Sequence, residues 1–137
     1  MADQKLIDGL NHALNREVST FLRYMIQAAT IKGAAWEPVR AMYLSEVNDE
    51  IGHAQYLAEM IVMLGGTPTL KPDLTPPPTD PRAMLEHDIE QERIDTEGYI
   101  KLAALADSAN LFDLKMKMEE QAADEANHAR QLQRLLG

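Results

Sequence analysis

The sequence predicts an all-α protein, a four-helix bundle with one long crossover loop between its second and third helices. Apolar residues recur at intervals of three and four over four long segments, which is the spacing of amphipathic helices. No segment shows the alternation of apolar and polar residues that is typical of strands. A length of 137 residues, 45 % of them hydrophobic, suits one core, so we expect a single domain over residues 1–137.

The first two helices are expected over residues 3–32 and 36–64. Asp3 can cap the first helix and Gly33 can end it, while Pro38 falls in the first turn of the second helix, where proline is tolerated. Each helix has an inner face that is apolar towards both ends and acidic at its middle. The residues on these two faces are Leu10, Leu14, Glu17, Phe21, Tyr24, Ala28 and Ile31, and Trp36, Val39, Tyr43, Glu46, Glu50, His53, Leu57, Met60 and Leu64.

Residues 65–80 are expected to form the crossover, because the segment begins with two glycines and contains five prolines. A segment of this length can span about 53 Å when extended at roughly 3.3 Å per residue. That is enough to run back along a whole helix. We therefore expect the third helix to begin at the same end of the bundle as the second.

The third and fourth helices are expected over residues 81–106 and 111–136, joined by a turn at residues 107–110. Asp80 followed by Pro81 is the pattern of a cap and a proline at the first helical position. The inner faces of these helices are again polar at the middle. Their residues are Leu85, Ile89, Glu92, Thr96, Tyr99, Ala103 and Ala106, and Leu111, Leu114, Met118, Gln121, Glu125, His128, Leu132 and Leu135.

A Glu-x-x-His pair occurs twice in the chain, at Glu50–His53 and 75 residues later at Glu125–His128. A Glu and a His three residues apart share one face of a helix and can bind one metal ion together. Glu17 and Glu92 each precede one of these pairs by 33 residues. Glu-rich helices produce a single Glu-x-x-His pair by chance. Two such pairs, each with a further Glu at the same distance upstream, are far less probable by chance. The pattern predicts a dinuclear metal site with six ligands: Glu17, Glu50, His53, Glu92, Glu125 and His128.

The charges of these side chains match two divalent cations. Four charged carboxylates without partners in a bundle core would cost several kcal/mol each. Two divalent ions bring four positive charges and the histidines are neutral as ligands, so the filled site is electroneutral. Carboxylate and imidazole suit iron or manganese. We expect two such ions per chain, either iron or manganese, with a metal-free structural bundle as the alternative.

At these residues the chain resembles the bacterioferritin branch of the ferritin-like di-iron proteins, over nearly its whole length. Four segments carry the likeness: Asn15-Arg16-Glu17 with Tyr24, Asp49-Glu50-x-x-His53, Met84-Leu85-x-x-Asp88 ahead of Glu92, and Asp124-Glu125-x-x-His128. The resemblance implies that Glu50 and Glu125 bridge two irons and that each iron has one His. It implies that Glu17 and Glu92 are terminal ligands. It also implies that Tyr24 is a catalytic hydrogen-bond partner and electron donor, and that Fe(II) is oxidised by O₂ or H₂O₂.

Three departures from the bacterioferritin pattern modify these expectations. Bacterioferritins have a haem-ligating Met directly after the first bridging Glu, where this chain has Ile51, so we predict no haem. Their inner-surface iron site has the pattern His-Glu-x-x-Asp, whereas this chain has Ser45-Glu46-x-x-Asp49. The sequence ends nine residues after His128, without the short fifth helix that lines cage pores in ferritins. We expect a homo-oligomer, either a dimer or a cage.

Five further residues are candidates for a place in or near the site. Glu46, one turn before Glu50, either passes iron inward or is a solvated or capped carboxylate. Tyr99 lies 75 residues after Tyr24 and either mirrors it at the site or packs in the core. His12 and His87 lie off the ligand face and are expected on the surface. Trp36 is expected in packing or in a subunit contact.

The leading functional hypothesis is a ferroxidase that oxidises Fe(II) for iron storage or detoxification. The alternatives are a rubrerythrin-like peroxidase, which the two tyrosines favour, and a dimanganese catalase-type enzyme. The chain has no cysteine, so a peroxidase would need a separate electron-transfer protein. A DNA-protecting mini-ferritin builds its sites between subunits, whereas this pattern places a complete site in one chain.

Composition excludes several other classes of protein. The net charge of −9 argues against direct nucleic-acid binding, which needs a basic face. No segment approaches the roughly 18 apolar residues of a membrane span, and the N-terminus has no signal pattern. We expect a soluble, cytoplasmic protein with no membrane partner.

Overall fold

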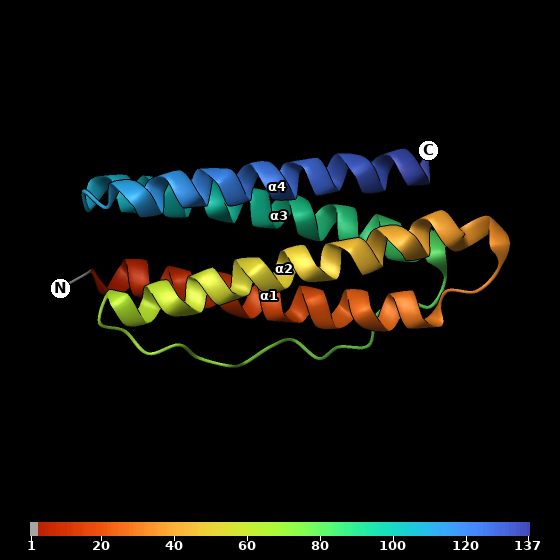
Figure 1. The fold of residues 1–137 in the computed structure, drawn as a ribbon, viewed down its shortest axis with the longest axis horizontal. Helices are drawn as coiled ribbons and strands as arrows, with labels where there is room; N and C mark the ends of the chain where they lie inside the picture. Colours follow the sequence, from red (N-terminus) through yellow and green to blue (C-terminus); the bar gives the residue numbers. More distant parts are fainter. Residues whose placement is uncertain (1–2) are drawn as a thin grey trace.

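The computed structural model describes residues 3–137 and has four long helices and no strand in that range (Figure 1). The helices are α1 (Gln4–Thr30), α2 (Glu37–Met63), α3 (Pro81–Ser108) and α4 (Phe112–Leu136), with a 3₁₀ turn, η1 (Ala34–Trp36), before α2. The prediction of an all-α four-helix bundle is confirmed. No described helix combines the length and the apolar character needed to cross a membrane.

Capping side chains fix the starts of α1 and α3. The carboxylate of Asp3 accepts a hydrogen bond from the Lys5 N–H (3.2 Å), and that of Asp80 accepts one from the Ala83 N–H (3.0 Å). Pro81 follows in the first turn of α3, as predicted. Both caps satisfy N–H groups that have no partner within the helix.

The helices α2 and α3 both end in the same type of hydrogen-bonded turn. The Gly66 N–H donates to the Ile61 carbonyl (2.8 Å), and the Leu111 N–H donates to the Ala106 carbonyl (2.9 Å). The turn needs a residue with positive φ, which is Gly65 (φ 89°) after α2 and Asn110 (φ 57°) after α3. Because Asn110 provides this conformation, α3 continues through Ser108, two residues beyond the expected range.

The crossover runs along α1 (Figure 1), so that α3 begins at the same end of the bundle as α2, as predicted. A row of side chains four residues apart on α1 accepts hydrogen bonds from every second N–H of the crossover. The pairs are Thr69 to Asn11 (2.8 Å), Lys71 to Asn15, and Asp73 to Ser19 (2.8 Å). Four helical residues rise about 6 Å and two extended residues about 6.6 Å, which keeps the two segments in register.

The helices pack mainly in two pairs, α1 with α2 and α3 with α4. The apolar core forms two clusters, one with Leu10, Leu57, Leu102 and Leu114 among its members, and one with Tyr43, Met84, Leu85 and Leu132. Every residue predicted on the inner faces is buried or partly buried. The acidic and histidine residues lie at the middle of the helices.

Candidate metal centre

Each helix contributes side chains to a cluster of carboxylates and imidazoles at the middle of the bundle, and the structure brings all six predicted ligands together there. All six are buried. They form two adjoining groups, in each of which one ligand atom per residue lies within 4.8 Å of the others. The first position comprises Glu17, Glu50, His53 and Glu125, and the second comprises Glu50, Glu92, Glu125 and His128. Glu50 and Glu125 belong to both positions.

The imidazoles present Nδ1 to the carboxylates. His53 Nδ1 lies 3.1 Å from Glu125 and 3.6 Å from Glu17. His128 Nδ1 lies 3.2 Å from Glu50 and 3.8 Å from Glu92. Each position therefore has one imidazole nitrogen, one carboxylate of its own and a share of two more.

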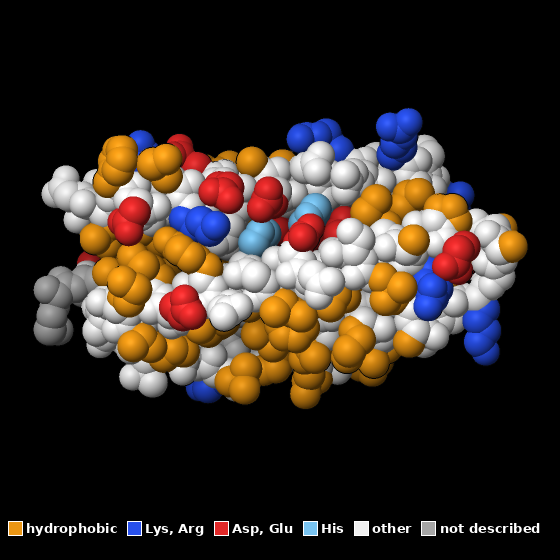
Figure 2. All heavy atoms as spheres, in the orientation of Figure 1, with side chains coloured by type: hydrophobic (Ala, Val, Ile, Leu, Met, Phe, Trp, Pro, Cys, Tyr) orange, Lys and Arg blue, Asp and Glu red, His pale blue; other side chains and the backbone are white. Residues whose placement is uncertain are grey.

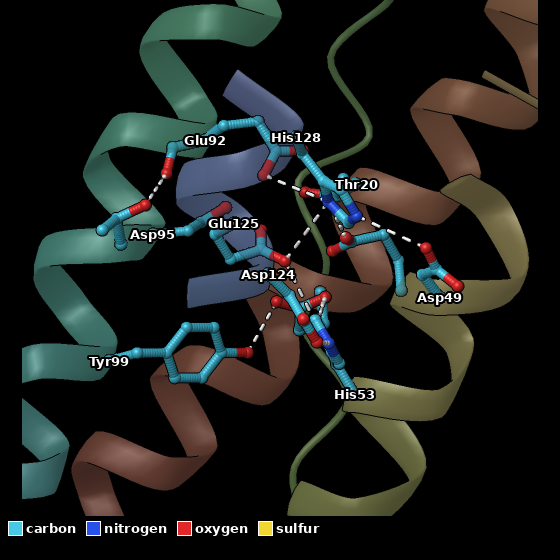
Figure 3. Close-up of polar contacts among 12 residues, drawn as sticks. Thr20, Asp49, His53, Glu92, Asp95, Tyr99, Asp124, Glu125 and His128 are labelled. Atoms are coloured by element: carbon cyan, nitrogen blue, oxygen red, sulfur yellow. Dashed lines mark hydrogen bonds and ion pairs between the residues drawn. The ribbon is translucent and has the colours of Figure 1, made fainter. Parts of the chain in front are cut away.

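Two tyrosines hold the unshared carboxylates. The Tyr99 hydroxyl on α3 donates to Glu17 Oε1 on α1 (2.6 Å), and the Tyr24 hydroxyl on α1 donates to Glu92 Oε1 on α3. Figure 3 shows the Tyr99 hydroxyl pointing towards the cluster. Sequence reasoning placed Tyr24 beside the site and left Tyr99 open. In the structure the two make equivalent contacts, and each leaves the second oxygen of its Glu free.

Two aspartates contact the other nitrogen of each imidazole. His53 Nε2 lies 3.0 Å from Asp124 Oδ2, and His128 Nε2 lies 3.3 Å from Asp49 Oδ2 (Figure 3). A carboxylate on Nε2 keeps the proton there and leaves the Nδ1 lone pair available to a metal. Sequence reasoning gave neither aspartate this role. The repeated Asp-Glu-x-x-His pattern marks both aspartates but does not indicate which imidazole each one contacts.

The site comes nearest to solvent between α2 and α4. Among its six residues the histidines are the most exposed, with 7 % for His53 and 5 % for His128. The side chains of Asp49 and Asp124 next to them are about half exposed. Figure 2 shows histidine side chains at the middle of one face with acidic side chains around them.

The polar atoms at the centre fit a pair of cations. Buried polar atoms normally have hydrogen-bond partners, and leaving them without any is costly. Here several side-chain atoms of the cluster have no hydrogen-bond partner among residues 3–137: Glu17 Oε2, both oxygens of Glu50 and of Glu125, Glu92 Oε2, His53 Nδ1 and His128 Nδ1. All are atoms that ligate iron or manganese, and they are the atoms left free by the tyrosines and aspartates.

The electrostatics of the cluster also favour added positive charge. Burial, and then the neighbouring Glu17, raise the pKa of Glu50 well above its ordinary range. Burial and the charges of Glu17 and Glu50 do the same to the pKa of Glu125. Burial alone would lower the pKa of His128, but Glu50 and Glu92 raise it to about 11. The carboxylates thus repel one another and attract any cation within reach.

The pKa of Glu92 is shifted in the opposite direction to those of the shared carboxylates. Burial favours its neutral form, but contacts with His128, Glu125 and Tyr24 outweigh burial and hold its pKa below the ordinary value. Glu92 is therefore the carboxylate of the second position that stays ionised most readily.

The other residues singled out in the sequence differ in their burial and contacts. Glu46 is buried, and neither of its oxygens has a hydrogen-bond partner among residues 3–137, so it is neither solvated nor capped. Burial raises its pKa to about 8. His12 and His87 are exposed, as expected. Trp36 packs against the apolar cluster of Tyr43 and Leu132.

Fold and site together define a four-helix bundle with a buried carboxylate–histidine cluster at its centre. The chain matches the ferritin-like domain family over residues 7–137 and belongs to it. It is 31 % identical to a bacterial ferritin of Pseudomonas aeruginosa over 134 residues, which cover 97 % of this chain and 87 % of the relative. The resemblance to bacterioferritins inferred from the sequence is confirmed.

Solved structures agree with this assignment. Ferritin-like, diiron-carboxylate proteins from Bacillus anthracis superpose with a TM-score of 0.93 at 40 % identity, covering 98 % of this chain and 96 % of that chain. A dodecameric thioferritin, the bacterioferritin-related protein of Bacteroides fragilis, superposes with a TM-score of 0.89 at 26 % identity, covering 98 % and 86 %. The dodecameric state is a property of the Bacteroides fragilis protein.

Proposed function

We propose that this protein is a di-iron ferroxidase of the bacterioferritin type, which oxidises Fe(II) with O₂ or H₂O₂ for iron storage or detoxification. The observation that carries the proposal is the pair of adjoining positions that share Glu50 and Glu125. Four carboxylates balance the charge of two divalent ions, and the free atoms of the cluster all face one region. We expect two irons per chain, with manganese as the alternative metal and no haem.

The proposed roles follow from the contacts of each residue. Glu50 and Glu125 would be shared by the two ions, Glu17 and Glu92 would each hold one ion, and His53 and His128 would each hold one ion through Nδ1. Iron held there would supply the one-electron redox chemistry. Tyr24 and Tyr99 orient the terminal carboxylates and lie close enough to donate a proton to them. The two apolar clusters of the core pack next to the site and exclude water from it.

Fe(II) as substrate would approach between α2 and α4. Asp49 and Asp124 are exposed there and touch the histidines, which are the least buried ligands. The net charge of −9 adds a field that concentrates cations near the protein. The exposed aspartates would therefore serve both to attract Fe(II) and to orient the imidazoles.

We also propose that the chain works as a homo-oligomer. Large apolar side chains are exposed on α1, α2 and the crossover, which is common at subunit contacts. They are Met25, Ile26, Leu44, Ile51, Leu70 and Leu74. The Bacteroides fragilis protein, whose fold is similar to this one, is dodecameric, which supports the proposal.

Stepwise addition of Fe(II) to metal-free protein under air tests the proposal, with oxidation followed by absorbance and particle size by sedimentation. We expect rapid oxidation of about two irons per chain, the number of positions in the site. Continued uptake into a soluble mineral would identify storage, and arrest at that number would identify an enzyme or iron donor. Glu50→Gln should abolish the rapid phase, whereas Glu59→Gln, on the exposed side of α2, should leave it intact. No oxidation in the unaltered protein would refute the ferroxidase proposal and turn attention to manganese.

A rubrerythrin-like peroxidase is the second candidate, and the paired tyrosines favour it. Tyr24 and Tyr99 make equivalent contacts with the two terminal carboxylates, so each ion has a redox-capable side chain next to it. Such an enzyme would reduce H₂O₂ repeatedly with electrons from a separate protein. Steady consumption of H₂O₂ with a soluble reductant, slowed in Tyr99→Phe, would favour this candidate. A single turnover limited by bound Fe(II) would exclude it.

A further inference from the structure

Among the buried positions at which the two halves of the chain differ, one pair lies a helical turn before the shared residues Glu50 and Glu125. Glu46 on α2 lies one turn before Glu50, and Gln121 on α4 lies one turn before Glu125, so that the 75-residue repeat relates the two. Both side chains are buried, with 2 % of Glu46 and 0 % of Gln121 exposed. No polar atom of either side chain has a hydrogen-bond partner among residues 3–137.

Glu46 lies beside the second position. His128 of that position lies 3.3 Å from Asp49 and 3.2 Å from Glu50, on the turn of α2 that directly follows Glu46. Gln121 occupies the equivalent place in the other half of the repeat, next to the helix turn that carries Glu125. One half therefore has an additional carboxylate where the other has a neutral amide of nearly the same shape.

Other buried carboxylates near the site do not produce this imbalance. Asp88 forms an ion pair with Arg23 (2.8 Å), and Asp95 forms one with Arg16, so each is matched by a positive charge. The tyrosine and aspartate contacts of the two positions are equivalent. Among residues 3–137, Glu46 is therefore the one buried carboxylate outside the six candidate ligands that forms no ion pair.

We propose that Glu46 and Gln121 make the two metal positions unequal, so that the second position, with Glu92 and His128, takes the first divalent cation and holds it more tightly. The inference rests on the proposed metal centre. A divalent ion next to Glu46 favours its ionised carboxylate and gains the attraction of that charge, which is little screened in a buried site. An ion in the first position meets the neutral side chain of Gln121. The pair would thereby set the order in which the site fills.

Calorimetric titration of metal-free protein with Zn(II), which has no redox chemistry, tests the inference. We expect two binding steps whose dissociation constants differ about tenfold or more. Glu46→Gln should make the two dissociation constants more alike, because it weakens the tighter binding step, at Glu92 and His128. Glu59→Gln, on the exposed side of α2, should leave the two constants different. Crystals with one equivalent of Zn(II) should show anomalous signal at Glu92 and His128. In the exchanged variant Glu46→Gln/Gln121→Glu, the signal should move to Glu17 and His53.

Each alternative result has a distinct meaning. Two equal steps in the unaltered protein would overturn the inference and leave the metal centre in place. Separate steps that persist in the same order in Glu46→Gln and in the exchanged variant would overturn it as well. Absence of Zn(II) binding in the unaltered protein would overturn the metal centre and the inference together. Both substitutions are nearly isosteric, and circular dichroism of the metal-free variants checks that the bundle is folded.

Discussion

The carboxylate of Asp124 lies 3.0 Å from Nε2 of His53, although the two residues come from different helices and from different copies of the repeat. Asp49 and His128 make the reciprocal contact at 3.3 Å. Each Glu-x-x-His helix thus orients the imidazole of the other. These contacts join α2 to α4, whose contact is otherwise limited because the helices pack mainly as α1 with α2 and α3 with α4.

Asp124→Asn should weaken metal binding at the first position. The amide cannot hold the Nε2 proton as a carboxylate does, so the Nδ1 lone pair of His53 becomes a poorer ligand. We expect a loss of about 10- to 100-fold in affinity for Zn(II), measured by competition with a chromophoric chelator. Asp113→Asn, at an exposed position on the same helix, is the matched control and should change nothing. Equal affinity of Asp124→Asn and the control would show that the contact has no role in binding.

Glu50→Gln should have opposite effects on stability with and without metal. Without metal the substitution removes a buried carboxylate that burial and Glu17 disfavour, so the free energy of unfolding at pH 8 should rise by about 1 to 3 kcal/mol. With saturating Zn(II), the unaltered protein should gain far more than the variant, because Glu50 belongs to both positions.

Thermal denaturation of both proteins, with and without Zn(II), measures this difference, and Glu59→Gln serves as the control. A purely structural bundle predicts a different result. In that case Glu50→Gln would be more stable under both conditions, and Zn(II) would stabilise neither protein.

The sequence was sufficient for the fold and for the six candidate ligands because both depend on periodicity. The spacing of apolar residues placed four helices, and the 75-residue repeat placed Glu17 and Glu92 on faces that meet the two Glu-x-x-His pairs. Helix geometry converts such spacings directly into shared faces.

Contacts between helices could not be obtained in this way. The pairing of Asp124 with His53 depends on how far α4 is rotated and shifted against α2, which no spacing within one helix encodes. The same holds for Tyr99 and Glu17. The role of Glu46 was left open because an acidic residue one turn from a ligand is solvated or buried according to the neighbouring helices.

Metal-free protein should become less stable as the pH rises from 5 to 8. Burial raises the pKa of Glu46 from 4.5 to about 8, so between these values the folded protein keeps a proton that the unfolded chain has released. The stabilisation is complete below pH 4.5 and is lost as the pH rises through 8. The raised pKa values of Asp95 and His128 act in the same direction.

Urea denaturation of metal-free protein at pH 5 and pH 8 measures this loss. In Glu46→Gln the decrease should be smaller by about 3 kcal/mol, because a tenfold change in the affinity of a carboxylate for its proton corresponds to about 1.4 kcal/mol. Glu59→Gln, whose side chain is exposed, should keep the full decrease. A decrease of the same size in both variants would mean that Glu46 does not hold its proton in the folded protein.

Asn15→Ala should loosen the crossover from α1. The Asn15 side chain donates to Thr69 Oγ1 (2.9 Å) and accepts from the Lys71 N–H, so the substitution removes the central pair of the row that fixes the crossover. We expect the free energy of unfolding to fall by about 1 to 2 kcal/mol, as for two lost hydrogen bonds. The Lys71 amide should also exchange with solvent faster, because its N–H loses its acceptor. Asn48→Ala, at an exposed position on α2, is the control and should change neither quantity. If the Lys71 amide exchanged at the same rate in Asn15→Ala as in the unaltered protein, the row on α1 would not be what holds the crossover in place.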